Sequence, residues 1–337
     1  MRPISIAFGA AAILALTLLA ADIQPINDLP NPYRTVRDWG QLPGGTTAWA
    51  AVTAVEASPD GSIYVIHRCH DNSCVGRTEP PILKMDKNGK LIKAWGAGMF
   101  NFPHGATVDR EGNLWVTDSQ FQNNGKGQVA YKFSPDGKVL MTLGKPGVTS
   151  ADPGLFDEPT DVAVAANGDV FITEGHVGGT PGNQRVSKFS KDGKFLKSWG
   201  KPGSGPGEFN NPHTIEIDSR GRVFVGDRSN NRIEIFDQDG KFLEEWRQFG
   251  RPSGIFIARD DTMYVADSES WGPDEPGWKK GIRIGSAKDG SVKYFIEDME
   301  STTVEHSGAE GVGVDADGNV YGAVVRRQML EKHIPKK

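Results

Sequence analysis

The sequence FPHGATVDREGNLWVTD at residues 102–118 returns as NPHTIEIDSRGRVFVGD at residues 211–227. In both copies, alternating apolar residues stand before and after a Gly-containing turn, as in two antiparallel strands. Weaker copies run through four other segments, which contain Ala51-Val52-Thr53, Glu158-Pro159-Thr160, Arg251-Pro252-Ser253 and Gly308-Ala309-Glu310. The chain therefore holds six repeated units, and repeats of this length indicate a repeat architecture.

Five of the units continue with a second turn signal, a Gly preceded by Asn or Asp. These dipeptides are Asn88-Gly89, Asp136-Gly137, Asp192-Gly193, Asp239-Gly240 and Asp289-Gly290. They are typical of tight hairpins, because Gly readily takes the positive φ that such turns need. The strands that follow them end in Trp95-Gly96, Leu143-Gly144, Trp199-Gly200 and Trp246. Each unit thus predicts four short strands, and six such units predict an all-β fold, a six-bladed β-propeller.

The two ends of the chain are predicted to meet in one blade. The sixth unit lacks an outer strand after Tyr321, whereas residues 33–40 match the outer strand of the third unit, residues 195–200. An N-terminal strand paired into the last blade would close the ring and remove its open edges. The alternative, two separate β-sandwiches, leaves the regular Trp-Gly and Asp-Gly spacing unexplained.

The composition is that of an ordinary globular protein. The 337 residues include 42 Gly, 21 Pro and 2 Cys, with 38 basic against 43 acidic side chains and a net charge of −5. This composition excludes a disordered or collagen-like chain. No Lys/Arg cluster gathers on one predicted face, so we expect no nucleic-acid partner. The sequence does not predict the oligomeric state.

Residues 1–21 are predicted to be a signal peptide. Arg2 precedes an apolar run from Ile6 to Leu19, and small residues stand just before Asp22. The run is shorter than a comfortable membrane span and no second one follows, so we expect no membrane span after signal removal. Residues 22–337 are expected to form a single propeller domain that is exported, either to the periplasm or as a secreted protein.

The two cysteines, Cys69 and Cys74, are predicted to form a small local disulfide bond. Export to an oxidising compartment favours this bond, and the CxxxxC spacing is not that of a zinc ribbon. The alternative is a metal clip that these cysteines form together with His67 and His70.

One position in each unit is predicted to face the central channel. The first strand of each propeller unit lines the channel. Counting back eight residues from the first turn gives the six residues Thr53, His104, Thr160, His213, Ser253 and Glu310. The three large ligand-type side chains lie on alternate blades and should converge on the axis. Two imidazoles and one carboxylate are ligands of a catalytic zinc or another divalent transition metal. The alternative is that each His merely bonds a neighbouring backbone carbonyl.

The end of the second strand should return to the same rim. There, units one and four carry Arg68 and Arg228, which suit a substrate with a carboxylate because Arg binds that group bidentately. Alternatively, each Arg pairs with an acid such as Asp227. His176 of unit three reaches the same rim and is the candidate general base or acid, unless it is a solvated loop residue.

At these residues the chain resembles the NHL-repeat propellers, and among them the peptidyl-α-hydroxyglycine α-amidating lyase family. The resemblance covers the chain from about Asn31 to its end. It implies a six-bladed propeller with a catalytic zinc on three channel histidines, and with two arginines and a tyrosine at the site. His67-Arg68 and Asp227-Arg228 resemble the two arginine motifs, and Pro103-His104-Gly105 and Pro212-His213-Thr214 resemble two zinc-histidine motifs.

The chain departs from the family pattern at three positions. Glu310 stands where the family has its third zinc histidine, which keeps a ligand but changes its charge. His176 stands at the position of the tyrosine, so the group that transfers protons differs or the reaction does. Gly311 replaces the acidic residue that binds the family's structural calcium, which argues against calcium here.

These features together predict an exported metal-dependent lyase that cleaves a carbinolamide-type C–N bond. Its substrate would be a small molecule or a peptide terminus that carries a carboxylate, and the resemblance and ligand set favour zinc as the divalent metal. Two alternatives stay open. The same residues could activate a metal-bound water for hydrolysis of a lactone or ester, or the protein is a non-catalytic binding propeller.

Overall fold

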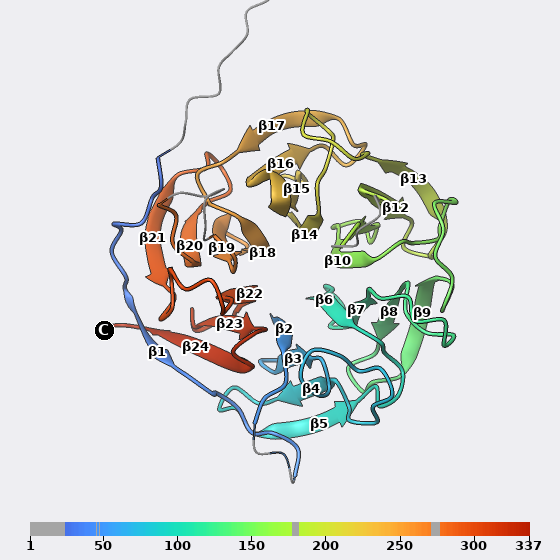
Figure 1. Ribbon diagram of the computed structural model, residues 1–337, viewed down its shortest axis with the longest axis horizontal. Coiled ribbons are helices and arrows are strands. Elements are labelled where there is room, and N and C mark those ends of the chain that lie inside the picture. The colour runs from blue at the N-terminus through green and yellow to red at the C-terminus, as the bar shows by residue number, and fades with distance from the viewer. Residues whose placement is uncertain (1–23, 45, 47, 177–181, 271–276) are drawn as a thin grey trace, which may run out of the picture.

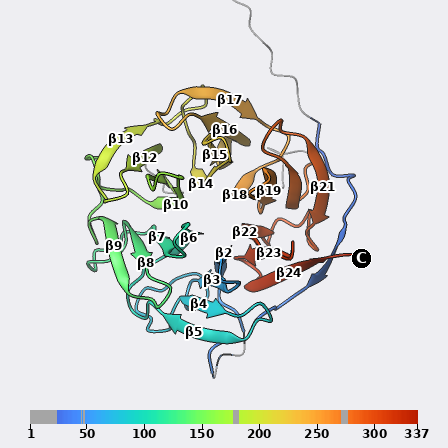
Figure 2. The ribbon, with the colours of Figure 1, turned by 180° about the vertical axis from the view of Figure 1, so that it is seen from behind.

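The computed structural model describes residues 24–44, 46, 48–176, 182–270 and 277–337. Six four-stranded sheets stand around a closed ring, which Figure 1 and Figure 2 show from its two sides. The six-bladed β-propeller predicted from the repeats is therefore confirmed. The predicted signal peptide lies outside the described residues.

Each of the first five blades runs in chain order from an inner strand at the axis to an outer strand at the rim. Blade 1 consists of β2 (Val52–Ala57), β3 (Ile63–His67), β4 (Ile82–Met85) and β5 (Leu91–Trp95). Blade 2 consists of β6 (Pro103–Val108), β7 (Leu114–Asp118), β8 (Val129–Phe133) and β9 (Val139–Gly144). Blade 3 consists of β10 (Pro159–Val164), β11 (Val170–Glu174), β12 (Arg185–Phe189) and β13 (Phe195–Trp199).

Blades 4 and 5 continue the pattern. Blade 4 consists of β14 (Pro212–Ile217), β15 (Val223–Asp227), β16 (Arg232–Phe236) and β17 (Phe242–Trp246), with the short 3-10 helix η1 (Arg228–Asn230) after β15. Blade 5 consists of β18 (Pro252–Ile257), β19 (Thr262–Asp267), β20 (Gly281–Ser286) and β21 (Val292–Glu297).

Blade 6 joins the two ends of the chain. It consists of β22 (Ala309–Val314), β23 (Val320–Val324), β24 (Met329–Pro335) and the N-terminal β1 (Tyr33–Val36). β1 pairs antiparallel with β24, from Tyr33 opposite Pro335 to Val36 opposite Lys332. In Figure 1 the blue β1 runs beside the red β24 at the rim. The predicted closure is confirmed, and the alternative of two β-sandwiches is wrong.

The hydrophobic core is divided among the six interfaces between neighbouring blades. Each buried cluster combines apolar side chains from two successive blades. Tyr64 and Ile66 of blade 1, for example, pack with Val116 and Phe133 of blade 2. The last interface joins blade 6 to blade 1 in the same way. A blade therefore buries its two faces only against its neighbours, which is why the repeats are stable as a closed set.

The outer strands lock onto the hairpin turns of the next blade. Trp199 ends β13, and its indole packs directly on Gly240 of blade 4. A Cβ atom added to Gly240 would lie only 2.6 Å from the indole ring, so no larger residue fits there. Trp95 contacts Gly137 of blade 2 in the same way, with a closest approach of 2.9 Å to such a Cβ. Both glycines also have positive φ, of 80° and 79°. The spacing of Trp-Gly and Asp-Gly in the sequence thus reflects contacts from one blade to the next.

Every inner strand carries a β-bulge near its start. Pairing between the first two strands of each blade slips after the first residue of the inner strand, for example between Pro212 and Thr214. The residue left unpaired is the channel position predicted from the repeats, such as His213 in blade 4. Bulges re-aim a side chain and increase the local twist. In blades 2, 4 and 6 they turn His104, His213 and Glu310 toward the axis.

Two further observations concern the predicted compartment. Cys69 and Cys74 form a disulfide bond, as predicted, so the alternative metal clip with His67 and His70 is wrong. A disulfide fits an oxidising environment. Over the described ranges, no helix is long and apolar enough to cross a membrane.

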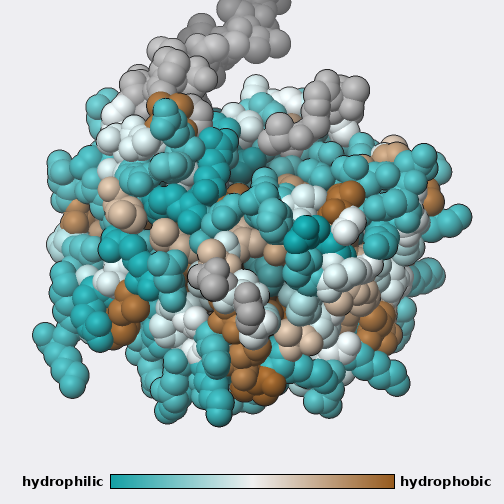
Figure 3. Space-filling model, turned by 60° about the horizontal axis from the view of Figure 1, so that its bottom comes forward, coloured by the Kyte–Doolittle hydropathy of each residue, from teal (hydrophilic) through white to brown (hydrophobic). Residues whose placement is uncertain are grey.

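The outer surface is mostly hydrophilic, with small separate apolar patches on the face in Figure 3. Exposed apolar side chains occur on the outer strands of successive blades, and they include Ile92, Leu140, Leu196, Leu243 and Tyr294. These residues are spread around the rim. Buried polar side chains occur both at the axis, for example His104 and His213, and farther out in the blades, for example Arg232 of β16 and Arg283 of β20.

Candidate metal centre and substrate mouth

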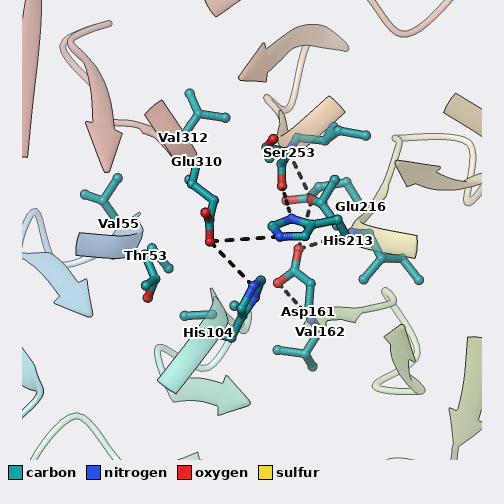
Figure 4. A pocket seen from close by; sticks show the side chains of 18 of the residues that line it. Thr53, Val55, His104, Asp161, Val162, His213, Glu216, Ser253, Glu310 and Val312 are labelled. Carbon is teal, nitrogen blue, oxygen red and sulfur yellow. Dashed lines mark hydrogen bonds and ion pairs between the residues drawn. The ribbon is translucent and has the colours of Figure 1, made fainter. Parts of the chain in front are cut away.

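The six channel positions occupy equivalent places, each as the second residue of an inner strand. His104 of β6, His213 of β14 and Glu310 of β22 point toward one another in Figure 4. All three side chains are buried, with exposed fractions of 3%, 2% and 7%. They line a cavity of ≈ 30 Å³ in the channel. The predicted convergence of these three residues is thus present in the structure.

Backbone carbonyls of the neighbouring blades fix the two imidazoles. Nδ1 of His104 lies 2.8 Å from the carbonyl oxygen of Thr160, and Nδ1 of His213 lies 2.7 Å from that of Ser253. A carbonyl can only accept a hydrogen bond, so each Nδ1 carries the proton and each Nε2 keeps its lone pair. This backbone bonding was the alternative to a metal site, but it is also the support that metal-ligating histidines usually have.

The small channel residues of blades 3 and 5 support the imidazoles of the blades beside them. The Thr160 hydroxyl donates to the carbonyl of Pro212 at 2.7 Å, and the Ser253 hydroxyl shares a 2.7 Å hydrogen bond with Ser268. Their side chains therefore stay at the blade interfaces. Their carbonyls remain available to the imidazoles of blades 2 and 4.

The three facing atoms fit a metal ion. Within the described part of the chain, Nε2 of His104, Nε2 of His213 and Oε1 of Glu310 are buried without a hydrogen-bond partner. Oε1 of Glu310 lies 3.5 Å and 3.9 Å from the two nitrogens. Ligand bonds of about 2.0–2.1 Å in a tetrahedral site would separate neighbouring ligand atoms by roughly 3.3–3.4 Å. The residues therefore suit a divalent transition metal with small adjustments.

His176 joins the same cluster from blade 3. Its ligand atom and those of His104 and His213 all lie within 4.8 Å of one another. The ring centroid of His176 is 4.7 Å from that of His104 and 5.5 Å from that of His213. Gly175 makes this placement possible, because it has a φ of +118° and a Cβ there would lie 2.5 Å from Gln184. The sequence placed His176 at the rim, and the structure brings it to the cluster.

Arg68 and Arg228, which we call the anchor arginines, are both buried at the mouth, with exposed fractions of 2% and 4%. Nη2 of Arg68 lies 3.6 Å from Oε1 of Glu310. Nη1 of Arg228 lies 3.7 Å from Glu269. Asp227, the alternative partner predicted from the sequence, instead binds Arg232 at 2.9 Å. The anchor arginines are therefore not ordinary solvated rim residues.

The electrostatics suit metal binding near neutral pH. Burial lowers the pKa of His104, His176 and His213 well below the usual imidazole range, and the Arg228 guanidinium acts in the same direction. Burial also lowers the pKa of Arg68 to about 10, while Glu310 opposes this shift. Metal ligation needs neutral imidazoles, and these histidines are neutral at pH 7.

The sequence did not indicate the residues that support the anchor arginines. Phe102 lies under the Arg68 guanidinium, 3.4 Å from its ring centroid to Cζ. Asn72 accepts a 2.6 Å hydrogen bond from Nη1 of Arg68. When its amide oxygen faces the guanidinium, Asn211 accepts from Nη2 of Arg228 at 2.9 Å. Asn211 directly precedes the Pro-His pair of blade 4, and this adjacency was the available signal.

Acidic residues also line the channel below the histidines. Burial raises the pKa of Asp161 to about 7 and that of Glu216 to about 8. Burial likewise raises the pKa of Glu56 well above its usual range, and the other two carboxyls add to this effect. These residues follow the channel positions by one or three residues, a spacing that differs between the repeats and so was not visible as a pattern in the sequence.

Comparison with known proteins supports the predicted resemblance. A family model described as a six-bladed β-propeller matches residues 181–248. NHL repeat-containing protein 3 of Homo sapiens is 36% identical over 201 residues, which is 58% of this chain and 54% of that protein. Peptidyl-alpha-hydroxyglycine alpha-amidating lyase 2 of Drosophila melanogaster is 32% identical over 53% of this chain and 44% of its own length.

A third relative matches most of the chain. Peptidyl-glycine alpha-amidating monooxygenase B of Xenopus laevis is 29% identical over 333 residues, which cover 89% of this chain and 35% of that protein. The chain is thus a six-bladed β-propeller with relatives named as NHL-repeat proteins and amidating lyases. It spans about half, or less, of the length of these relatives.

Solved structures share the fold. A streptogramin B lyase has a TM-score of 0.56 at 17% identity and covers 89% of this chain and 97% of its own. A gluconolactonase from Xanthomonas campestris has a TM-score of 0.60 at 12% identity and covers 90% of this chain and 89% of its own. At such low identity these similarities concern the fold alone.

Proposed function

We propose that the protein is a metal-dependent lyase that cleaves the C–N bond of an α-hydroxyglycine-type substrate to give an amide and glyoxylate. One observation carries this proposal. Two imidazole nitrogens and one carboxylate oxygen, all buried without a hydrogen-bond partner, meet in the channel beside the buried guanidiniums of the anchor arginines. The relatives named as amidating lyases support the same reaction class.

His104, His213 and Glu310 would hold the metal, with zinc as the first candidate. When bound, such an ion acts as a Lewis acid and lowers the pKa of a hydroxyl group beside it. Gly311 leaves the channel without the acidic residue expected for the family's calcium, so calcium is not part of the proposal.

The anchor arginines would bind the substrate carboxylate. Nη2 of Arg68 is buried and makes no hydrogen bond within the described ranges, and its ion pair with Glu310 is long, at 3.6 Å, so a substrate carboxylate can compete for this donor. Both guanidiniums stay charged at neutral pH. A carboxylate between them would gain charge-assisted hydrogen bonds and would orient the neighbouring carbinol carbon toward the histidines.

His176 would move the proton. As a neutral imidazole it takes the proton of the carbinol hydroxyl, and the oxygen electron pair then forms the carbonyl group of glyoxylate. The C–N bond breaks, and its electron pair goes to the amide nitrogen. His176 returns the proton to that nitrogen, so the products are the free amide and glyoxylate. Its low pKa favours this return.

Export is part of the proposed function. The Cys69–Cys74 disulfide supports an oxidising compartment. Cleavage of the predicted signal peptide can be tested by N-terminal sequencing of the protein recovered from outside the cytoplasm. Recovery of the uncleaved chain inside the cell would contradict export.

Elemental analysis is the first test. We expect about one zinc or other transition metal per chain in the wild type, and loss of the metal from a His104→Ala/His213→Ala variant. The matched control is His70→Ala/His306→Ala, because these imidazoles are exposed. A wild type that stays metal-free after divalent ions are added would favour a non-catalytic binding propeller.

Turnover is the second test. A synthetic peptide that ends in α-hydroxyglycine should yield peptide amide and glyoxylate in equal amounts, while a panel of lactones and esters should not react. The reverse result, lactone hydrolysis without glyoxylate release, would replace the lyase by a hydrolase on the same site.

A further inference from the structure

The loop that follows Arg68 is closed by the disulfide bond. Cys69 is the next residue along the chain, and it is linked to Cys74, five positions later, with a Cα–Cα distance of 5.0 Å. Asn72 lies between the two cysteines and accepts the 2.6 Å hydrogen bond from Nη1 of Arg68. The loop therefore begins at the arginine that it contacts.

The contact with Asn72 is the shortest that the Arg68 guanidinium makes. Nε donates to the carbonyl of Pro103 at 3.4 Å, and Phe102 covers one face of the group. Nη2 faces Glu310 at 3.6 Å. Pro103 and Phe102 constrain the plane of the guanidinium. Asn72 holds the Nη1 end, and this leaves Nη2 aimed at the channel.

The loop takes a conformation that its sequence does not favour. Cys69 and Asp71 have φ values of 44° and 48°, in the left-handed region that L-residues with side chains rarely adopt. Two backbone hydrogen bonds, from Ala51 N to Asp71 O and from Cys74 N to Asn101 O, tie the loop to blades 1 and 2. Removing the cross-link would free the unfavourable residues to relax, and Asn72 would move with them.

We propose that Asn72 is a positioning residue for Arg68 and that its hold depends on the Cys69–Cys74 bond. Reduction would then weaken the binding of a substrate carboxylate. In that step a dithiol gives two electrons and two protons to the bond, the two cysteines become thiols, and the dithiol becomes a disulfide. This inference rests on the proposed role of Arg68 as an anchor for a carboxylate.

The second anchor arginine provides an internal comparison. Arg228 begins η1 directly after β15, and its asparagine partner, Asn211, is 3% exposed at the start of the inner strand. Asn211 is held by hydrogen bonds, from its N–H to the Gln184 side chain and from Arg228 N–H to its carbonyl, and no disulfide closes its segment. The redox state should act on the Arg68 side of the mouth alone.

Binding of glyoxylate to zinc-loaded protein, measured by isothermal titration calorimetry, tests this inference without turnover. We expect Asn72→Ala to raise the Kd about five- to tenfold, because a hydrogen bond to a charged group is lost. Asn72→Asp keeps the oxygen acceptor but adds a negative charge beside Arg68, so it should also raise the Kd for glyoxylate, and more strongly at low salt than at high salt, whereas the effect of Asn72→Ala should not depend on salt in this way. Asn88→Ala, an exposed asparagine in a hairpin turn of the same blade, is the matched control.

The disulfide is tested in the same assay. Cys69→Ser/Cys74→Ser, and wild type that is reduced with dithiothreitol and desalted anaerobically, should both match Asn72→Ala. Reduction of the Asn72→Ala variant should add no further loss. Metal content is measured in every sample, so a weaker Kd cannot reflect lost zinc.

The outcomes separate the two proposals. Suppose that wild type binds glyoxylate and that Arg68→Ala binds it more weakly, whereas Asn72→Ala and the cysteine variant bind it as tightly as wild type. The positioning role of Asn72 is then wrong, and the role of Arg68 as a carboxylate anchor is retained. If zinc-loaded wild type binds no glyoxylate, the anchor role fails, and the inference fails with it. If the cysteine variant does not fold, Asn72→Ala decides the positioning role, and the reduced wild type, which should bind as weakly as Asn72→Ala, decides the role of the disulfide.

Discussion

Replacing Glu310 tests the metal centre most directly, because this residue is the main departure from a three-histidine site. Glu310→Gln keeps the shape of the side chain and removes its charge. We expect the affinity for zinc to fall at least about 100-fold, or roughly 3 kcal/mol. Glu310→His would supply a third imidazole and should retain zinc.

The magnitude follows from the arrangement of the site. Oε1 of Glu310 lies 3.5 Å and 3.9 Å from the two imidazole nitrogens, close to the spacing of ligands that share one ion. Loss of a partner that only supports a ligand typically costs 10–100-fold in metal affinity. Loss of a direct ligand should cost at least the upper end of that range. Removal of the negative charge also leaves two neutral imidazoles beside two guanidiniums.

The assay is competition with a chromophoric chelator at pH 7.5, with circular dichroism as a check of folding. Thr53→Ala is the matched control, because Thr53 holds the same register position on blade 1 and its hydroxyl donates to the carbonyl of Pro103 at 3.3 Å. Zinc affinity within threefold of wild type in Glu310→Gln would remove Glu310 from the ligand set. The metal would then have to rest on the imidazoles.

Three other predictions concern pH dependence, the turns and the mouth. Burial raises the pKa of Asp161 from 3.8 to about 7, so the contribution of its protonated form to stability is full below pH 4 and is lost as the pH rises through 7. In urea titrations of the metal-free proteins, the free energy of unfolding of Asp161→Asn should therefore gain up to about 4 kcal/mol on that of wild type between pH 4 and pH 8. A difference that stays constant with pH would refute this. Gly240→Ala should lower the free energy of unfolding by about 2–4 kcal/mol in the same assay, because the new methyl group would collide with Trp199. Gly61 has a similar positive φ but nothing within 4 Å of an added Cβ, so Gly61→Ala should show only the smaller cost of the backbone conformation. Equal losses in the two variants would exclude a role for the contact with Trp199. Arg68→Ala should raise the KM for a hydroxyglycine peptide about 10–100-fold with little change in thermal stability, and Arg68→Lys should rescue it poorly; a fall confined to kcat would contradict the anchor role.

The repeats made most of the fold predictable. Two copies with the same Pro-His, Asp and Gly spacing, at residues 102–118 and 211–227, fixed the register of the other units, so six blades and their closure by an N-terminal strand within residues 33–40 could be inferred. The observed strand covers residues 33–36. The packing of Trp199 on Gly240 was visible only as a regular spacing. It joins two different blades, and a single repeat does not specify which residue of the next blade it will touch.

The same register made the channel residues predictable, but it did not predict the bulges that orient them or the residues that hold the anchor arginines. His104, His213 and Glu310 emerged because a propeller places equivalent positions of all blades around one axis. The bulge that turns each of them inward was not anticipated, because it depends on strand pairing, which sequence periodicity does not report. Asn72 was missed because it reaches Arg68 through a disulfide-closed loop outside the repeat.

The two readings of the channel histidines, as structural residues or as metal ligands, turn out not to compete. The hydrogen bond from Nδ1 of His104 to the carbonyl of Thr160 is the contact expected of a structural histidine. The same bond assigns the proton to Nδ1 and leaves Nε2 as a lone pair in a buried site. In a histidine that only stabilises the blade interface, a buried Nε2 without a hydrogen-bond partner would lower the stability of the protein, because burying an unsatisfied polar group costs free energy. With His213 arranged in the same way and a carboxylate opposite, that cost is most simply offset by an ion that binds all three.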